Sequence, residues 1–473
     1  MQKSEYAGIR VLIMGLGLHG GGLESARYFA ERGADVTVTD LGDEERLAPS
    51  LRKLEGLRIR YVLGRHEMAD FEEADIVVKN PGVRPDSPYL LVCRRVETDL
   101  SLFLARNPAR LTAITGSKGK STTASAVHWV LQAARSAGIL PGGAYLGGNI
   151  TLSPLTFLDN LTPQDDVVLE LSSWQIGDLR GRRKETGEAL LKPRAAILTG
   201  ILPDHLDRYG GMDAYVEDKR IIYRGQDARD VTVVSDDSWG RSFRAESKAR
   251  PLSYGESPLP PGLSGGWLTG AEGPGLARLG GEVFEAVPRI LKIPGYHQKK
   301  NILAGALALL DLNIPREFVR ESLGRFPGLP HRLEFFHTFR GIRFYNDTAS
   351  TIPEAAAAAV SAFDRPPILV AGGTDKQLDF SPLVSGAAKA KALILLAGTG
   401  TDRLMPLLRA RGIAFQGAFD ALEPAVAAAL RGAASGDPVV LSPGCASFGM
   451  FLNEFDRGAK WKAAVLRLTG SIF

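Results

Sequence analysis

The chain has 473 residues, more than one hydrophobic core usually organises, so two or three domains are expected. Its 57 Lys and Arg residues against 53 Asp and Glu residues leave a formal net charge of +4, which is too weak to argue for nucleic-acid or membrane binding. Two cysteines, Cys93 and Cys445, cannot build a disulfide framework and are typical of a reducing compartment. The sequence has neither a signal-peptide start nor an apolar run of about 18 residues, so a soluble cytoplasmic protein is expected.

Short apolar runs alternate with helical stretches along the chain, which predicts an α/β fold of parallel sheets covered by helices. The expected strands fall into three regions: 11–14, 36–39 and 76–78; then 111–115, 167–171, 195–199 and 231–234; then 342–345, 368–371, 393–397 and 439–441. Domain boundaries are expected near residues 99 and 330. A patch rich in Pro, Gly and Ser at 251–266 is expected to be a loop within the second region.

The first region carries a glycine motif directly after its first expected strand. Residues 15–20 read G-L-G-L-H-G, and Asp40 ends the next expected strand about twenty residues further on, as in a dinucleotide-binding fingerprint. The same pattern builds a close backbone approach for any diphosphate, so a uridine diphosphate fits as well as NAD(P), and a plain glycine turn remains an alternative. The turn N-P-G-V-R-P at 80–85 follows the third expected strand, on the ligand-bearing edge of the sheet.

Residues 115–122, T-G-S-K-G-K-S-T, lie between an expected strand and an expected helix. Small residues let backbone N–H groups turn toward phosphate oxygens, Lys120 supplies a positive charge, and the hydroxyl of Ser121 or Thr122 can hold Mg²⁺. The spacing departs from the common G-x-x-x-x-G-K-[ST] pattern, because Ile114 stands five residues before Gly119. The segment indicates an ATP phosphate cradle of a narrower family, with a simple glycine turn as the alternative.

Acidic and polar residues follow the later strands of the second region. E-L-S-S-W-Q at 170–175 begins where a buried strand is expected to end, which makes Glu170 a candidate Mg²⁺ ligand. His205, in P-D-H-L-D-R-Y at 203–209, is either a second metal position or an ordinary core or surface histidine, and Lys219 on the next expected helix would alone be read as solvated. The turn G-G-N-I at 147–150 presents Asn149, which either contacts a phosphate or acyl oxygen or only shapes the turn.

Taken in order, these motifs resemble those of the Mur ligase family, ATP-dependent amide-forming enzymes of bacterial wall synthesis. The likeness continues through G-Y-H-Q-K-K-N at 295–301, P-H-R-L-E at 330–334, N-D-T at 346–348, G-G-T-D-K at 372–376 and S-P-G-C-A-S-F at 442–448. The resemblance implies a Rossmann-like N-terminal domain for the UDP substrate (1–98), a central P-loop ATPase-like domain (99–329) and a Rossmann-like C-terminal domain for glutamate (330–473). The third domain is expected to close over ATP.

The implied reaction joins glutamate, with D-glutamate favoured, to UDP-N-acetylmuramoyl-L-alanine through an acyl phosphate in peptidoglycan precursor synthesis. The implied catalytic residues are Lys120, Glu170, His205 and Lys219, and the implied Mg²⁺ ligands are Ser121, Glu170, His205 and Lys219 as its carbamate. ATP contacts are implied for Gly116, Ser117, Lys118, Gly119, Lys120, Ser121, Thr122, Gln298, Asn301, Arg332 and Asp347. The UDP substrate is expected at Gly17, Leu18, His19, Asp40, Asn80, Pro81, Gly82, Asn149 and Ser172, and glutamate at Thr351, Lys376, Ser447 and Phe455.

The expected partners are small molecules bound by a monomer, without nucleic acid or membrane insertion. Ala349 stands where many D-glutamate-adding relatives carry a lysine, and Phe455 lies one position from the expected aromatic, so an L-glutamate-adding variant remains an alternative. Folylpolyglutamate synthase, which lacks a uridine-binding domain, and an NAD-dependent dehydrogenase are further alternatives. The basic stretch at 180–184 is expected to be a solvated surface loop.

Overall fold

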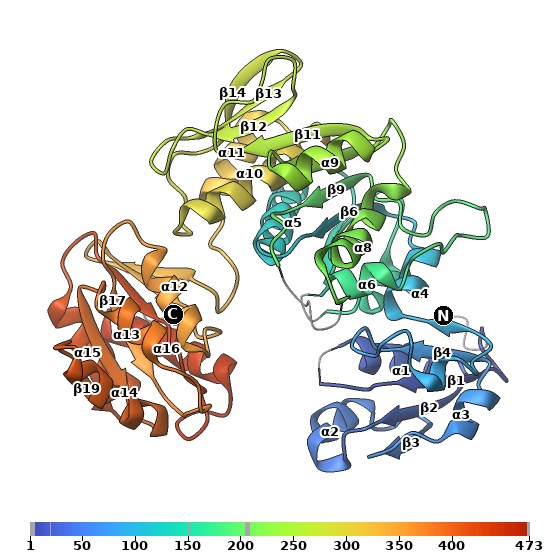
Figure 1. The fold of residues 1–473 in the computed structure, drawn as a ribbon, viewed down its shortest axis with the longest axis horizontal. Coiled ribbons are helices and arrows are strands. Elements are labelled where there is room, and N and C mark those ends of the chain that lie inside the picture. Colours follow the sequence, from blue (N-terminus) through green and yellow to red (C-terminus); the bar gives the residue numbers. More distant parts are fainter. Residues whose placement is uncertain (1–4, 19, 150–151, 204–208, 471–473) are drawn as a thin grey trace. The chain divides into compact units, whose positions relative to one another are not determined.

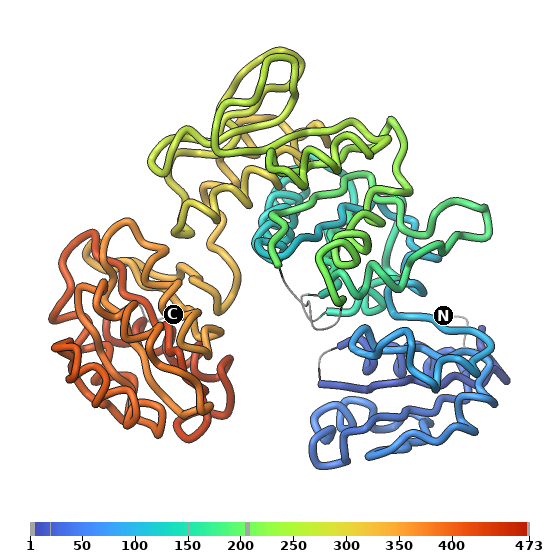
Figure 2. Tube along the Cα trace, viewed as in Figure 1, coloured from blue at the N-terminus to red at the C-terminus, as the bar shows by residue number. Residues whose placement is uncertain are grey.

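A computed structural model describes residues 5–18, 20–149, 152–203 and 209–470 (Figure 1). The chain forms two compact units. The first comprises Met1–Thr269, Gly275–Val287 and Asn301–Arg320, and the second comprises Gly270–Pro274, Pro288–Lys300 and Glu321–Phe473. Three sheets organise these units, two in the first and one in the second, and the tube in Figure 2 follows the chain through each of them.

The first sheet is wholly parallel, with the strand order β3-β2-β1-β4-β5. Its strands are β1 (Arg10–Met14), β2 (Asp35–Asp40), β3 (Ile59–Leu63), β4 (Ile76–Lys79) and β5 (Val96–Glu97), and its helices are α1 (Gly21–Ala30), α2 (Glu44–Leu51) and α3 (Met68–Glu73). β1 is an apolar run buried on both faces, as expected for a central parallel strand. The strand order reverses between β1 and β4, the point where such sheets bind ligands beyond the carboxyl ends of their strands.

The second sheet has nine strands in the order β14-β13-β12-β11-β10-β9-β6-β8-β7. They are β6 (Arg110–Thr115), β7 (Ala144–Gly148), β8 (Asp166–Glu170), β9 (Ala195–Leu198), β10 (Val231–Ser235), β11 (Arg250–Gly255), β12 (Gly265–Leu268), β13 (Gly275–Leu279) and β14 (Glu282–Val287). The helices of this region are α4 (Asp99–Arg106), α5 (Lys120–Ser136), α6 (Ser173–Gly177), α8 (Met212–Arg224), α9 (Ser238–Glu246), α10 (Tyr296–Asp311) and α11 (Arg316–Arg325). Ala124, Val127, Leu131 and Ala134 give α5 an apolar face at helical spacing, and all four are buried.

The expectation of a loop at 251–266 is wrong at both ends. Residues 251–255 belong to β11 and residues 265–266 to β12, which pair in parallel with each other. Beyond them, β12, β13 and β14 run antiparallel, so the sheet is not parallel throughout. Gly280 and Gly281, both with positive φ, form the two-residue turn between β13 and β14, which matches the glycine preference of tight hairpins.

The third sheet lies in the second unit, with the order β15-β16-β20-β17-β18-β19. Its strands are β15 (Glu334–Phe339), β16 (Ile342–Asn346), β17 (Ile368–Gly372), β18 (Ala392–Leu396), β19 (Gln416–Phe419) and β20 (Pro438–Leu441). Its helices are α12 (Pro353–Ser361), α13 (Ser381–Ala387), α14 (Thr399–Ala410), α15 (Leu422–Gly432) and α16 (Glu454–Leu468). Only β15 runs antiparallel to its neighbour, and separate apolar clusters cover the two faces of the sheet.

The expected α/β class is confirmed, and every strand expected from the sequence overlaps a strand of the structure. The strands that were not expected lie mostly at sheet edges or in the antiparallel extension. These strands are short and contain polar residues or glycine, so they lack a clear apolar run. Among the described residues, no helix is both long and apolar enough to cross a membrane.

Candidate functional site

The segment after β6 forms a loop that requires glycine at two positions. Gly116 has φ +146° and Gly119 has φ +90°, and α5 begins at Lys120. A Cβ at Gly116 would overlap the Thr199 hydroxyl, and a Cβ at Gly119 would overlap the side-chain amide of Asn301. The loop therefore brings bare backbone to the positive end of a 17-residue helix, an arrangement suited to phosphate.

Lys120 covers this loop. Its Nζ donates hydrogen bonds to the carbonyl oxygens of Gly116 (3.0 Å) and Ser117 (3.1 Å). Ser117 is buried, and its hydroxyl hydrogen-bonds the Leu202 carbonyl and the Tyr215 hydroxyl at 2.8 and 2.9 Å. The Ser117 side chain thus braces the loop, while Lys118 is exposed and Ser121 and Thr122 lie in the first turn of α5.

Lys219 reaches the same loop from α8. Its side chain is 1% exposed, and its Nζ donates to the Gly116 carbonyl at 3.0 Å and lies 3.5 Å from Thr115 Oγ1. The nitrogen also lies 4.4 Å from the centre of the Tyr215 ring. The reading of Lys219 as a solvated lysine is therefore wrong, because the fold buries it against the phosphate cradle.

Glu170 ends β8, the strand that pairs with β6 beside the cradle. Its carboxyl group is buried, with the residue only 2% exposed, and Oε1 accepts a hydrogen bond from Asn149 Nδ2 at 2.9 Å. Among the described residues, Oε2 has no hydrogen-bond partner. A buried carboxylate oxygen left without a donor is costly unless a cation or another donor reaches it.

Three other residues expected at the ATP and metal site are His205, Asn301 and Gln298. His205 lies outside the described residues, as does Ile150 after Asn149. Asn301, on α10, lies against Gly119, and its carbonyl accepts a hydrogen bond from Thr123 Oγ1 at 3.2 Å. Gln298 belongs to the second unit, where it lies in the first turn of α10 and its N–H donates to the Gly295 carbonyl at 3.0 Å.

The glycine motif of the first sheet is braced by acidic and amide side chains. Gly15, Gly17 and Gly20 all have positive φ. Asp40 accepts hydrogen bonds from the backbone N–H of Gly17 at 3.1 Å and of Gly42 at 2.8 Å. Each of its carboxylate oxygens is therefore hydrogen-bonded to a backbone N–H group. Leu18 is exposed, and His19 lies outside the described residues.

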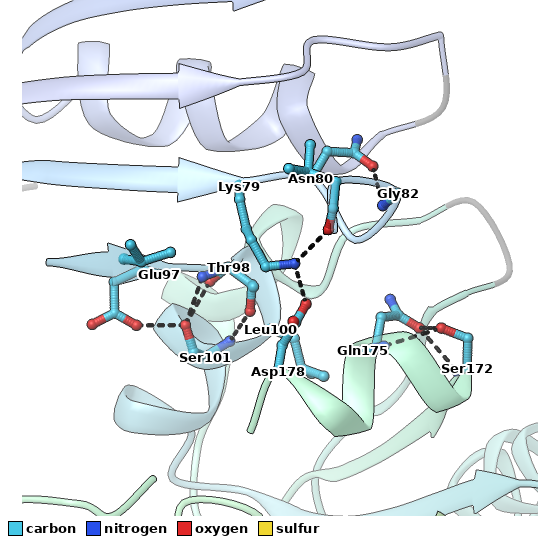
Figure 3. Close-up of polar contacts among 12 residues, drawn as sticks. Lys79, Asn80, Gly82, Glu97, Thr98, Leu100, Ser101, Ser172, Gln175 and Asp178 are labelled. Carbon is cyan, nitrogen blue, oxygen red and sulfur yellow. Dashed lines mark hydrogen bonds and ion pairs between the residues drawn. The ribbon is translucent and has the colours of Figure 1, made fainter. Parts of the chain in front are cut away.

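Asn80 joins the turn after β4 to this glycine loop. Its Oδ1 accepts a hydrogen bond from the Gly82 N–H at 3.0 Å, and a Cβ at Gly15 would lie 3.0 Å from Asn80 Cβ (Figure 3). In the second sheet, Ser172 and Gln175 cap α6 reciprocally through their side chains. The Ser172 hydroxyl is therefore engaged at the start of that helix.

In the second unit, Asp347 is buried at the end of β16. It accepts hydrogen bonds from the Leu333 N–H at 3.0 Å and from the hydroxyls of Ser350 and Ser442. Burial raises the pKa of the Asp347 carboxyl to about 6, although these hydrogen bonds act in the opposite direction. Arg332, the expected γ-phosphate contact, lies exposed in the segment before β15.

The residues expected to bind glutamate gather partly on the third sheet. Lys376 Nζ donates to Thr351 Oγ1 at 3.1 Å, which joins two of them directly. Ser447 is buried beside the bridge between Thr374 and Ala446. Phe455 is half exposed, with its ring 5.3 Å from the His331 ring.

The structure adds charged residues that the motifs did not identify. Arg457, on α16, is buried and donates to the Thr348 and Cys445 carbonyl oxygens and to Thr348 Oγ1, so it ties together two loops of the expected glutamate site. Burial lowers the pKa of its guanidinium to about 10. Lys79 is the other; it ends an otherwise apolar strand, but this position in the sequence does not distinguish a buried lysine from a solvated one.

The basic stretch at 180–184 is not simply a solvated loop. Arg180 pairs with Asp218 at 2.6 Å, and Arg182 pairs with Glu97 at 2.6 Å. Arg182 also donates to the Val96 carbonyl at 2.7 Å. The stretch is a loop in which Arg180 is exposed, as expected, but these ion pairs could not be predicted because the acidic partners are distant along the chain.

Comparisons with known proteins agree with these features. Residues 9–99 match the family model described as Mur ligase MurD-like, N-terminal domain, and residues 114–309 match the Mur ligase middle domain. The chain is 40% identical to the UDP-N-acetylmuramoylalanine–D-glutamate ligase of Treponema pallidum, over 97% of each chain. It is also 40% identical to the ligase of the same name from Roseiflexus sp., over 98% of this chain and 100% of the relative.

Solved structures show the same fold at lower identity. A UDP-N-acetylmuramate–alanine ligase from Thermotoga maritima has a TM-score of 0.54 at 21% identity and covers 98% of this chain and 100% of its own. A ligase from Thermotoga maritima in complex with ADP has a TM-score of 0.52 at 16% identity, covering 98% and 96%. Full-length identity at this level to curated relatives, together with the two domain matches, shows that the chain belongs to the Mur ligase family.

Proposed function

We propose that this protein is an ATP-dependent ligase that joins D-glutamate to UDP-N-acetylmuramoyl-L-alanine in peptidoglycan precursor synthesis. The relatives of that name span the whole chain. The observation that carries the proposal is the convergence of Lys120, Glu170 and Lys219 around one phosphate cradle. The alternative is a ligase that adds L-glutamate, and a comparison of the two glutamate enantiomers as acceptors distinguishes them.

Each of the three sheets is assigned to one substrate. We assign residues 1–98 to the UDP substrate, 99–329 to ATP and the amide-forming chemistry, and 330–473 to glutamate. The first assignment is supported by the glycine loop, which Asp40 and Asn80 brace for close backbone approach. The last is supported by Lys376, whose ammonium lies beside Thr351 and suits a side-chain carboxylate.

Mg²⁺ fits the residues around the cradle. Oε2 of buried Glu170, which has no hydrogen-bond partner among the described residues, is the type of hard oxygen that this ion prefers, and Ser121 follows the cradle lysine. No group of three or more His, Cys, Asp or Glu side chains suited to a metal occurs among the described residues, so further ligands are needed. We assign them to His205 and to a carbamate on Lys219; when bound, Mg²⁺ would neutralise charge on phosphate oxygens.

Carbamylation would resolve a conflict at Lys219. An ammonium 3.0 Å from the Gly116 carbonyl is a good hydrogen-bond donor, but it would repel a cation placed beside Glu170. Reaction of the neutral amine with CO₂, with loss of one proton, gives a carbamate, which reverses the sign of the charge. The burial of Lys219 would shield that carbamate from water.

The first chemical step activates a carboxylate. The carboxylate of the alanyl substrate attacks the γ-phosphorus of ATP, which gives an acyl phosphate and ADP. Lys120 stabilises the charge on the phosphoryl oxygens from the start of α5, and Arg332 is the proposed second cation. Gln298 and Asp347 are assigned to the nucleotide, as is Asn301, which lies against the cradle.

The second step forms the amide. The neutral amine of glutamate attacks the acyl carbon, and the tetrahedral intermediate collapses to the amide and inorganic phosphate. Asn149 already donates to Glu170 and therefore lies where an amide can orient an acyl or phosphate oxygen. Lys376, Thr351 and Ser447 are assigned to hold glutamate, with Phe455 at the pocket edge.

The test is phosphate release from ATP with UDP-N-acetylmuramoyl-L-alanine and one amino acid at a time. D-glutamate should support turnover, whereas L-glutamate and diaminopimelate should not. Turnover with L-glutamate alone would replace the acceptor assignment, and phosphate release without any UDP substrate would contradict the ligase assignment. Because ATP and nucleotide sugars are cytoplasmic metabolites, we place the protein in the cytoplasm, as a monomer acting on small molecules.

A further inference from the structure

Lys79 places a positive charge at the end of a buried strand. Its side chain is 4% exposed, and its Nζ donates to Asp178 Oδ2 at 2.7 Å; the Asp178 side chain is 6% exposed (Figure 3). The same nitrogen donates to the Val83 carbonyl at 3.1 Å. A buried ammonium is tolerated only where hydrogen-bond acceptors replace its hydration water. The Asp178 carboxylate and the Val83 carbonyl, from different parts of the chain, act as such acceptors for Lys79.

One end of this contact fixes the turn after β4. The Val83 N–H donates to the Asn80 carbonyl at 2.9 Å, and the Gly82 N–H donates to Asn80 Oδ1, so Lys79 closes a turn that is already hydrogen-bonded internally. Asn80 in turn packs against Gly15 of the glycine loop. The conformation of the turn therefore bears directly on the loop proposed to bind the diphosphate.

The other end fixes α6. Asp178 directly follows this helix, and its N–H donates to the Trp174 carbonyl at 3.1 Å. Ser172 and Gln175 cap the opposite end of the same short helix, which begins just after Glu170. Because α6 spans only five residues, a displacement of Asp178 is transmitted to the segment that carries Glu170 and Ser172.

The ion pair borders a cavity, so packing directly around it is incomplete. Lys79 and Asp178 line a cavity of about 660 Å³, whose wall also includes Arg84 and Trp174. Because side chains do not fill this cavity, the ion pair contributes directly to the alignment of the two segments, in addition to the apolar cluster that both regions share.

We propose that the Lys79–Asp178 ion pair positions the Asn80–Val83 turn relative to the Glu170–Gln175 segment, so that the UDP part of the substrate and its reacting carboxylate are held together at the ATP cradle. Lys79 and Asp178 are positioning residues, because they act through Asn80 and α6. This inference rests on the proposed function for the identity of the substrate. Misalignment of a reacting group by about 1 Å costs on the order of a hundredfold in rate, so a small relaxation here is measurable.

A second ion pair between the same two sheets supplies a matched control. Arg182 pairs with Glu97 at 2.6 Å, with side chains 27% and 12% exposed, and it also donates to the Val96 carbonyl. Glu97 belongs to β5 and accepts a hydrogen bond from Ser101 in the first turn of α4, away from the Asn80 turn (Figure 3). Arg182 Nε also donates to the Asp178 backbone carbonyl at 2.8 Å, a contact four residues apart within the same loop. Arg182→Met therefore removes a link to β5 while leaving the Lys79–Asp178 side-chain ion pair in place.

The experiment compares Lys79→Met, Asp178→Asn, the double variant and Arg182→Met by steady-state kinetics and thermal unfolding. Each single variant leaves the other member of the buried ion pair without its partner, so each should lower the midpoint temperature of thermal unfolding. The double variant should recover part of that lost stability. The KM for UDP-N-acetylmuramoyl-L-alanine should rise about tenfold in both single variants and stay raised in the double variant, with the KM for ATP within about twofold of wild type. Arg182→Met should keep both KM values.

Recovery of the UDP-substrate KM together with stability in the double variant would overturn the proposal, since the pair would then be only structural. Equal rises in both KM values would overturn it as well. Hydrogen exchange of residues 79–83 in the protein without ligands gives a readout independent of the substrate. Faster exchange there in Lys79→Met but not in Arg182→Met supports the positioning role of the ion pair, even if the wild-type protein does not turn over the proposed substrate. Unchanged exchange in Lys79→Met contradicts that role.

Discussion

Two loops of the first unit share one local pattern but present different chemistry. Each follows a central parallel strand, turns on glycines with positive φ and leads into a helix: residues 15–20 before α1, and residues 116–119 before α5. The first is braced by the carboxylate of Asp40, which accepts the Gly17 N–H. The second is covered by the ammonium groups of Lys120 and Lys219, which both donate to the Gly116 carbonyl.

In the proposed roles, tertiary partners, and not the glycine pattern, distinguish the two loops. A loop braced by an anion offers backbone contacts and suits a diphosphate that is only held. A loop lined by cations suits a phosphoryl group that is transferred, as does the Glu170 oxygen on the adjacent strand, which has no hydrogen-bond partner in the described part of the chain. The predictions below test that division.

The largest effect is expected for Lys120→Ala. Removal of the cation at the start of α5 should lower kcat by about a thousandfold, because charge develops on the transferred phosphoryl group. The KM for the UDP substrate should change little. Lys248→Ala, which removes an exposed lysine of the same unit, is the control. Phosphate-release kinetics decide the matter, and a kcat near wild type for Lys120→Ala would refute the role of this cradle.

Lys219→Ala is expected to lower kcat by about a hundredfold, in line with loss of a positioned charged group. If the active form is a carbamate, formate or acetate should restore part of the activity, because a small carboxylate can enter the space left by the side chain. Thermal unfolding should show that the variant remains folded. Rescue by methylammonium and not by formate would show that the positive amine is the working form.

Gly17→Val should act on the other loop. At φ +61° a valine is strained, and its side chain would point toward the amide of Asn80, so the KM for the UDP substrate should rise about tenfold. Gly56→Val is the matched control, since Gly56, in the turn before β3, has φ +83° but no described atom within 4 Å of an added Cβ. If both variants raise the UDP-substrate KM equally, general strain explains the effect and the loop assignment fails.

The smallest effect concerns Asp347 and pH. Its folded pKa, raised to about 6 by burial, lies above the ordinary value of 3.8, so the protonated carboxyl favours the folded protein. That contribution is fully present below about pH 4 and is lost as the pH rises through about 6. Relative to wild type, Asp347→Asn should therefore gain stability between pH 4.5 and 7, as measured by thermal unfolding. A difference that does not vary with pH would contradict the raised pKa.

The sequence was sufficient for the parts of the fold that depend on local patterns. The apolar runs of the central strands and the glycines at 116 and 119 are visible in the sequence, and the strand–loop–helix arrangement follows from them. The hairpin at β13 and β14 was missed although Gly280 and Gly281 were a usable signal. The family resemblance, and not spacing, singled out Lys219.

Contacts between residues that are distant along the chain could not be predicted from the sequence. The pairing of Lys79 with Asp178 joins positions 99 residues apart, and no local pattern separates such a lysine from a solvated one. Arg457 is similar, because only the fold reveals that its guanidinium is buried against backbone carbonyl groups. Arg182, expected in a solvated loop, pairs with Glu97 for the same reason.

The most direct test of the proposed reaction follows oxygen from the substrate carboxylate. UDP-N-acetylmuramoyl-L-alanine labelled with ¹⁸O in its alanyl carboxylate is incubated with ATP and D-glutamate, and the inorganic phosphate is analysed by mass spectrometry. Activation as an acyl phosphate predicts that one labelled oxygen appears in the phosphate for each amide formed. Phosphate without label, alongside labelled amide product, would contradict phosphoryl transfer to the substrate carboxylate at this cradle.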